Sequence, residues 1–158
     1  MQEPTQKLLV AVELLERALA AYFEGKYFFA ALHLAGGADE ILGVYVNRLG
    51  EESSFESLRD GAVKISSFLD EGRESSARDI AAIMNHAKNR TKHLDKIGDD
   101  DICFDPETET VNLLDRAVSN YYRLINYFNL SETELISRFN KELVGRHAPS
   151  DRDTHTPN

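Results

Sequence analysis

Apolar residues recur at spacings of three and four along almost the whole chain, which is the pattern of amphipathic helices. Glycines that end helices, and Ser or Asp residues that begin them, divide this pattern into six segments. The helices are expected at about 5–23, 27–49, 53–70, 75–97, 105–128 and 131–144. Short loops between long helices make neighbours antiparallel, so the sequence predicts an all-α, up-and-down bundle. It should have five long helices and one short C-terminal helix.

The helix starts carry recognisable capping signals. Ser53 precedes Glu56 by three residues, the spacing of a capping box, and Ser131 precedes Glu134 in the same way. Asp105 is followed by proline, which suits an N-cap and the first helical position. One helical domain is therefore predicted over 1–145, followed by a disordered polar tail over 146–158.

The segment 27–49 has a near-continuous apolar surface, which predicts the most buried helix. It is as long as a membrane span, but His33, Asp39 and Glu40 lie at its centre, where ionisable groups are costly. A buried helix of a soluble bundle is the preferred interpretation, with no membrane contact.

One line of this helix carries polar residues at seven-residue intervals: Lys26, His33, Glu40 and Asn47. Gly36 and Gly37 lie in the same helix, where each glycine costs about 1 kcal/mol relative to alanine. Close approach of another helix, such as the one carrying His86 and His93, would compensate for that cost. His33 and Glu40 could form a buried pair there, or the line could be a narrow polar seam at the surface.

Composition narrows the class of protein. The chain has 158 residues, of which 42% are hydrophobic and 28% charged, as in a soluble globular domain. Its net charge of −9 argues against broad electrostatic binding to nucleic acid or anionic membranes, so any such contact must be a local patch. A single cysteine, Cys103, excludes an intramolecular disulfide and fits a reducing cytoplasm. The N-terminus lacks the pattern of a signal peptide, so a cytoplasmic location is expected.

The segment 85–93 is basic and rich in amides inside this acidic chain, and it contains no carboxylate. As part of the helix expected at 75–97, it shows on a helical wheel a core stripe and two outward ridges. The core stripe is Ile80, Ile83, Met84, Ala87, Thr91 and Leu94. One ridge is Asn85, Lys88, Asn89 and Lys92, and the other is His86, Arg90 and His93.

Two interpretations of these ridges stay open. Histidines can exchange protons near neutral pH, cations can hold a phosphate, and asparagine can orient a hydroxyl, as in a metal-independent ribonuclease. Alternatively, the ridges are a solvated helix face whose cations pair with the acidic segment that follows. That segment contains Asp99, Asp100, Asp101, Asp105, Glu107 and Glu109.

The helix at 105–128 carries a second candidate surface. Arg116, Asn120, Arg123 and Tyr127 follow one another at helical spacing and could extend a phosphate-binding face or form an ordinary exposed face. No cofactor motif is present. The acidic segment lacks the glycine and glutamate of an EF-hand loop, and no Glu-x-x-His pair suggests a di-iron bundle. Neither a metal nor a cofactor is expected.

The segment Lys88-Asn89-Arg90-Thr91-Lys92-His93 resembles the motif of the HEPN superfamily, which is an all-α bundle. Its ribonuclease members carry arginine, a polar residue, and histidine four to six positions after the arginine, and they commonly dimerise so that two motifs face one cleft. In this chain Lys88 stands where the family has arginine, and Asp95 where some toxin members have tyrosine. The segment 22–43, with Leu34-Ala35-Gly36-Gly37-Ala38-Asp39-Glu40, also looks like that of bacterial HEPN-like proteins, and the resemblance covers about residues 5–130.

The resemblance implies a homodimeric, RNA- or nucleotide-directed protein of the toxin or defence type. His93 would be the acid/base, Lys88 the phosphate clamp and Asn89 the orienting group. Nucleic-acid contacts would come from Asn85, Arg90, Lys92, Arg116 and Arg123, with His33, Glu40 and His86 supporting the site. The alternative function is a non-catalytic helical interaction or dimerisation module of the same fold. The two differ in whether Lys88, Asn89 and His93 line one open cleft.

Overall fold

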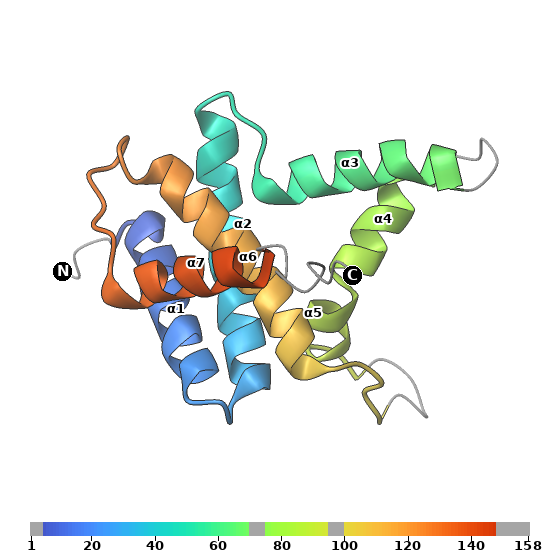
Figure 1. Cartoon of the computed structure of the whole chain (residues 1–158), viewed down its shortest axis with the longest axis horizontal. Coiled ribbons are helices and arrows are strands. Elements are labelled where there is room, and N and C mark those ends of the chain that lie inside the picture. The colour runs from blue at the N-terminus through green and yellow to red at the C-terminus, as the bar shows by residue number, and fades with distance from the viewer. Residues whose placement is uncertain (1–4, 70–74, 95–99, 148–158) are drawn as a thin grey trace, which may run out of the picture.

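The computed structural model describes residues 5–69, 75–94 and 100–147, and within them every regular element is an α-helix. The helices are α1 (Lys7–Phe23), α2 (Phe28–Arg48), α3 (Ser54–Leu69), α4 (Ala77–Met84), α5 (His86–Arg90), α6 (Pro106–Leu124) and α7 (Glu134–His147) (Figure 1). The predicted all-α class is confirmed.

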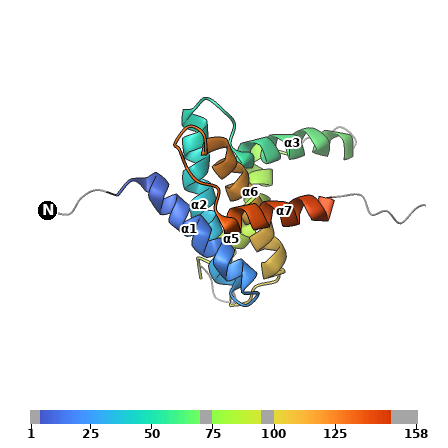
Figure 2. The same cartoon turned by 60° about the vertical axis from the view of Figure 1, so that its left-hand side comes forward.

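The core is built around α2, which packs against α1 on one side and α6 on the other. α7 contacts α1 and α6 and crosses them (Figures 1 and 2). The largest fully buried side chains come from these four helices and include Leu15, Leu32, Leu114 and Phe139. Burying one such side chain contributes about 1.5–3 kcal/mol, so this packing supplies most of the driving force for folding.

The prediction that 27–49 is the most buried helix is only partly right, because α6 is at least as buried. Nine residues of α2 are buried, and α6 buries nine in a shorter helix. By length and composition α2 could cross a membrane. In this structure it is the central packed helix, and it carries the buried Asp39.

The simple up-and-down arrangement is wrong for the middle of the chain. α3 leaves the end of α2 and projects sideways, and α4 returns from its far end towards α5 (Figures 1 and 2). α3 packs against α4 and, at its beginning, against α6. Ser54 is the one buried residue of α3, and the described residues of α4 include none. These two helices, Ser54–Leu69 and Ala77–Met84, are called the hairpin below.

The predicted continuous helix at 75–97 is also wrong, because it breaks at Asn85. That residue has φ −102° and ψ 2°, outside the helical region, and α5 begins after it. A wheel at a constant 100° per residue fails across such a break. Two residues of the predicted core stripe, Ile83 in α4 and Leu94 beyond the end of α5, are 70% and 71% exposed. Lys88, which was expected on an outward ridge, is buried.

Helix starts follow the capping signals more closely. The Ser53 hydroxyl accepts from the Glu56 amide at 3.3 Å, and the Glu56 carboxylate accepts from the Ser53 amide at 3.0 Å, which completes the predicted capping box. Asp105 caps α6 by accepting from the Thr108 amide at 3.0 Å. The cap of α7 is Thr133 rather than Ser131, since its hydroxyl accepts from the Ile136 amide at 3.3 Å.

α7 continues to His147, so the predicted tail begins at least two residues later than expected. Arg146 belongs to the fold: it pairs with Glu142 at 2.6 Å and donates to the Tyr22 hydroxyl at 2.9 Å. The rest of the predicted tail, 148–158, lies outside the described residues.

Candidate functional site

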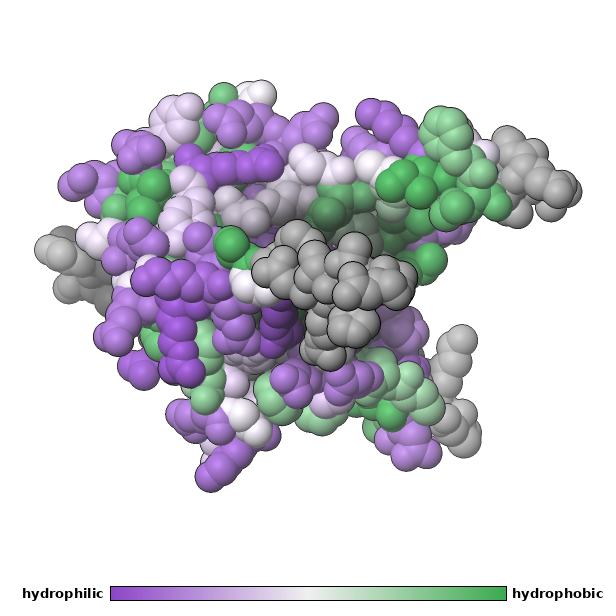
Figure 3. All heavy atoms as spheres, in the orientation of Figure 1, coloured by the Kyte–Doolittle hydropathy of each residue, from purple (hydrophilic) through white to green (hydrophobic). Residues whose placement is uncertain are grey.

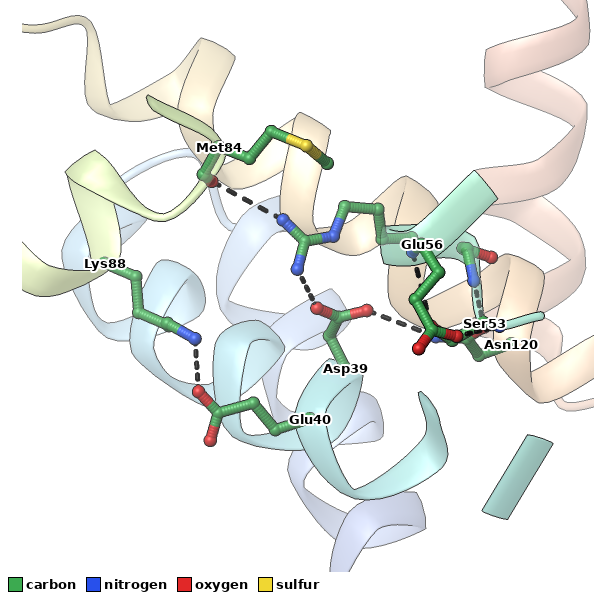
Figure 4. A network of polar contacts seen from close by, with 9 residues as sticks. Asp39, Glu40, Ser53, Glu56, Met84, Lys88 and Asn120 are labelled. Atoms are coloured by element: carbon green, nitrogen blue, oxygen red, sulfur yellow. Dashed lines mark hydrogen bonds and ion pairs between the residues drawn. The ribbon is translucent and has the colours of Figure 1, made fainter. Parts of the chain in front are cut away.

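A buried ion pair joins the two central helices. Asp39 of α2 pairs with Arg116 of α6, and their side chains are 3% and 5% exposed (Figure 4). The Asn120 side-chain amide, also buried, donates to the second oxygen of Asp39 at 3.2 Å. A charged pair this deep needs further hydrogen bonds to offset its desolvation, and Asn120 supplies one of them.

The same residues hold both ends of the hairpin. The Arg116 guanidinium carbon lies 4.8 Å from the centre of the Phe55 ring, in the first turn of α3. Its Nη1 donates to the Met84 carbonyl, the last residue of α4, at 3.5 Å. The Asn120 carbonyl accepts from the Ser54 amide at 2.8 Å. Asp39, Arg116 and Asn120, called the polar node below, therefore fix where the hairpin leaves the core.

Burial governs the electrostatics of the polar node. Desolvation raises the pKa of Asp39 above its ordinary value, and the adjacent Arg116 guanidinium opposes that rise. Removing Arg116 alone would leave an uncompensated carboxylate in the interior, which is costly.

A second ion pair joins α2 to α5. Lys88 pairs with Glu40, and the lysine side chain is 6% exposed whereas that of Glu40 is 56% exposed. The lysine stem lies against Gly36: a Cβ at that position would be 2.7 Å from Lys88 Cδ. The expected close approach to this glycine is therefore observed. Of the two arrangements left open by the sequence, the His33–Glu40 pair is not the one that forms, because Glu40 pairs with Lys88.

His33 is half-buried beside the end of the basic segment. Burial lowers its pKa below the ordinary value, the nearby Lys92 lowers it further, and a hydrogen bond to the Thr91 main chain opposes the shift. His33 therefore interacts with the 85–93 segment through Thr91 and Lys92.

The three residues predicted to form a catalytic group do not line one common cavity among those described. Lys88 lines a cavity of about 300 Å³ at the base of the hairpin, together with Asn85 and residues of α2 and α3. Asn89 and His93 are exposed and are not among its lining residues.

The remaining residues of the basic segment lie at the surface or against the acidic segment. Lys92 and His86 are exposed, and the His86 ring lies 6.4 Å from that of Phe104. Arg90 donates to the Asp101 carbonyl at 3.0 Å. At this hydrogen bond the basic helix meets the acidic segment through a main-chain oxygen.

The phosphate-binding face considered for 105–128 does not form, because two of its residues lie inside the protein. Arg116 and Asn120 are buried in the polar node, and Arg123 is half-buried and donates to the Glu52 carbonyl. A signal was present: Arg116 and Asn120 fall among the buried apolar positions Leu113, Ala117, Tyr121 and Leu124. Asp39 likewise lies in the middle of an apolar helix, and a buried carboxylate requires a cationic partner.

The hairpin carries an exposed apolar surface that was also missed. In α3 the residues Phe55, Leu58, Ala62, Ile65 and Leu69 repeat at alternating intervals of three and four, the spacing of a helix-pairing seam. Leu58, Ile65 and Leu69 are 52%, 57% and 81% exposed, and the neighbouring Phe68 is 87% exposed. Hydrophobic residues gather over the outer half of α3 in Figure 3. These four exposed side chains are called the α3 apolar patch below.

Within the described segments, no group of three His, Cys, Asp or Glu residues is placed so that it could hold a metal ion.

No protein-family model matches the chain, and no curated protein or solved structure matches it either.

Proposed function

We propose that this protein is a helical interaction module that forms a homodimer through the α3 apolar patch on its hairpin. The observation that carries this proposal is the contrast between the hairpin's base and its outer half. The base is held by buried, hydrogen-bonded groups, whereas the outer half leaves Ile65, Phe68 and Leu69 in solvent. A contiguous exposed patch of large apolar residues is typical of an interaction surface.

The size of the patch suits a specific contact. A large apolar residue exposes about 200 Å² when fully solvated. The exposed fractions of the four α3 side chains therefore correspond to about 550 Å² per copy. Pairing two copies would bury up to about 1,100 Å², which reaches the roughly 1,000 Å² expected of a specific interface.

The local charge of the hairpin permits a second copy as the partner. The whole chain carries a net charge of −9, so two copies repel each other at long range. Within α3, however, Glu56 and Asp60 are balanced by Arg59 and Lys64, and α4 carries one residue of each sign. Two hairpins related by a twofold axis would thus meet through neutral helices, in the four-helix arrangement of a small bundle.

The geometry favours this function over the RNA-directed alternative. A phosphate clamp needs a cation that is free to meet its ligand, whereas Lys88 is buried and paired with Glu40. The buried Arg116 is likewise paired with Asp39. The exposed His93 does not share the cavity that Lys88 lines.

Sedimentation velocity over a range of micromolar concentrations tests the proposal. The wild type should self-associate reversibly, and Phe68→Glu should shift it to monomer. Losing one buried large side chain costs about 1.5–3 kcal/mol and the change occurs in both copies, so the dissociation constant should rise at least about a hundredfold. The matched control is Val144→Glu on α7, since Val144 is also an apolar residue with 66% exposure.

Circular dichroism should show both variants folded, because neither side chain belongs to the core. A monomeric wild type at every concentration would overturn the proposal. So would a Val144→Glu variant that dissociates as readily as Phe68→Glu.

A further inference from the structure

The cavity at the base of the hairpin contains two buried polar atoms that lack a partner. They are Nε of Arg116 and Oδ1 of Asn85, neither of which has a hydrogen-bond partner in the structure. The Arg116 side chain is only 5% exposed. Both Arg116 and Asn85 line the cavity. An unpaired buried donor or acceptor costs about 1–3 kcal/mol, so these atoms would gain from a ligand that meets both.

The two atoms specify complementary groups on that ligand. Arg116 Nε–H is a donor and calls for an acceptor, most favourably a carboxylate oxygen, because charge-assisted hydrogen bonds are the strong ones. Asn85 Oδ1 is an acceptor and calls for an N–H donor. The required molecule therefore presents an acceptor and a donor together.

The charged side chains around the cavity restrict the charge of the ligand. Asp39 is balanced by Arg116, and Glu40 is balanced by Lys88. Glu56 also lines the cavity and, among the described residues, it accepts from Ser53 but forms no ion pair. The third cation of the lining, Arg59, pairs with Asp60, which does not line the cavity. An anion would meet this carboxylate unfavourably, whereas an ammonium group would be attracted to it.

The apolar lining completes the description. Phe55 and Val44 face the same cavity, whose volume of about 300 Å³ leaves room for a short side chain beside two polar groups. We propose that this cavity binds a free amino acid as its zwitterion. The carboxylate would accept from Arg116 Nε, the ammonium would donate to Asn85 Oδ1 near Glu56, and the side chain would lie against Phe55 and Val44.

The test is isothermal titration of the full-length protein with each free L-amino acid in turn. Some amino acid should bind saturably. Its amide, which lacks the carboxylate, and its N-acetyl derivative, which lacks the ammonium, should each bind at least about tenfold more weakly. Phosphate and a nucleoside monophosphate should give no saturable heat.

Asn85→Ala should weaken binding of the same amino acid at least about tenfold, because it removes the acceptor. Asn85 makes no side-chain cap hydrogen bond, so this change leaves the helix ends intact. The matched control is Asn89→Ala, an exposed asparagine of the adjoining helix α5 that does not line the cavity, and it should bind like the wild type.

Absence of saturable binding for every amino acid at millimolar concentration would overturn the proposal, as would equal binding of the N-acetyl derivative. Neither result would bear on the dimer proposal, because self-association is measured separately by sedimentation velocity.

Discussion

The buried Asp39–Arg116 pair gives the sharpest test of how the fold is held together. Replacing Arg116 with methionine removes the guanidinium and leaves the Asp39 carboxylate at 3% exposure without its cation. Removing one partner of a buried pair typically costs about 3–5 kcal/mol. The lost contacts to Phe55 and to the Met84 carbonyl act in the same direction. We therefore expect Arg116→Met to lower the free energy of unfolding by about 4 kcal/mol.

The double variant separates charge burial from packing. In Asp39→Leu/Arg116→Met neither charge remains, so the penalty of an isolated buried ion disappears, although the Asn120 amide still loses its acceptor at about 1–3 kcal/mol. The double variant should accordingly be more stable than Arg116→Met alone, with a coupling energy of about 2 kcal/mol or more.

Urea denaturation followed by circular dichroism measures these values. The control is Arg146→Met, which breaks the surface pair with Glu142 and should cost less than about 1 kcal/mol. If Arg116→Met costs no more than that control, or if the two node substitutions are simply additive, the reasoning about the polar node is refuted.

Three further outcomes are expected. Gly36→Ala should destabilise the fold, because its Cβ would lie 2.7 Å from Lys88 Cδ. The control Gly61→Ala adds a Cβ that meets nothing within 4 Å, so it should stabilise α3 by about 0.5–1 kcal/mol in the same urea assay. Burial and a hydrogen bond to Glu132 raise the pKa of Tyr122 from 10.0 to about 12. The protonated hydroxyl therefore contributes to the free energy of unfolding below pH 10.0, and this contribution is lost as the pH rises to about 12. Tyr122→Phe should flatten that alkaline decline in urea titrations at successive pH values. Purified wild type and His93→Ala should leave mixed RNA equally intact on a gel, and cleavage that depends on His93 would instead support the RNA-directed function.

The helical class and most helix starts could be predicted because their signals are local. Apolar spacing within one helix and a cap three residues from its amide partner are both written in short stretches of chain, as at Ser53 and Asp105. The close approach at Gly36 could also be anticipated, since a glycine inside a helix has a cost that packing must offset.

The features that were missed depend on contacts far apart in the sequence. The sequence places Arg116 on a phosphate-binding or exposed face, because its partner Asp39 is 77 residues away and helical spacing alone does not reveal it. The break at Asn85 carries neither glycine nor proline, so a wheel drawn through it placed Lys88 on the wrong side. The hairpin looked like part of the bundle because its apolar spacing is that of a packed helix. Within the described chain, those side chains lie at the surface instead.

Hydrogen exchange at two protein concentrations tests the central claim, dimerisation through the hairpin, most directly. Peptides from Ser54–Leu69 and Ala77–Met84 should exchange more slowly at the concentration where the dimer forms, and Phe68→Glu should abolish the difference. Peptides from Glu134–His147 should exchange at the same rate at both concentrations. The proposal would be contradicted if protection in the hairpin did not depend on concentration, or if the protected surface were α5 or α7 instead.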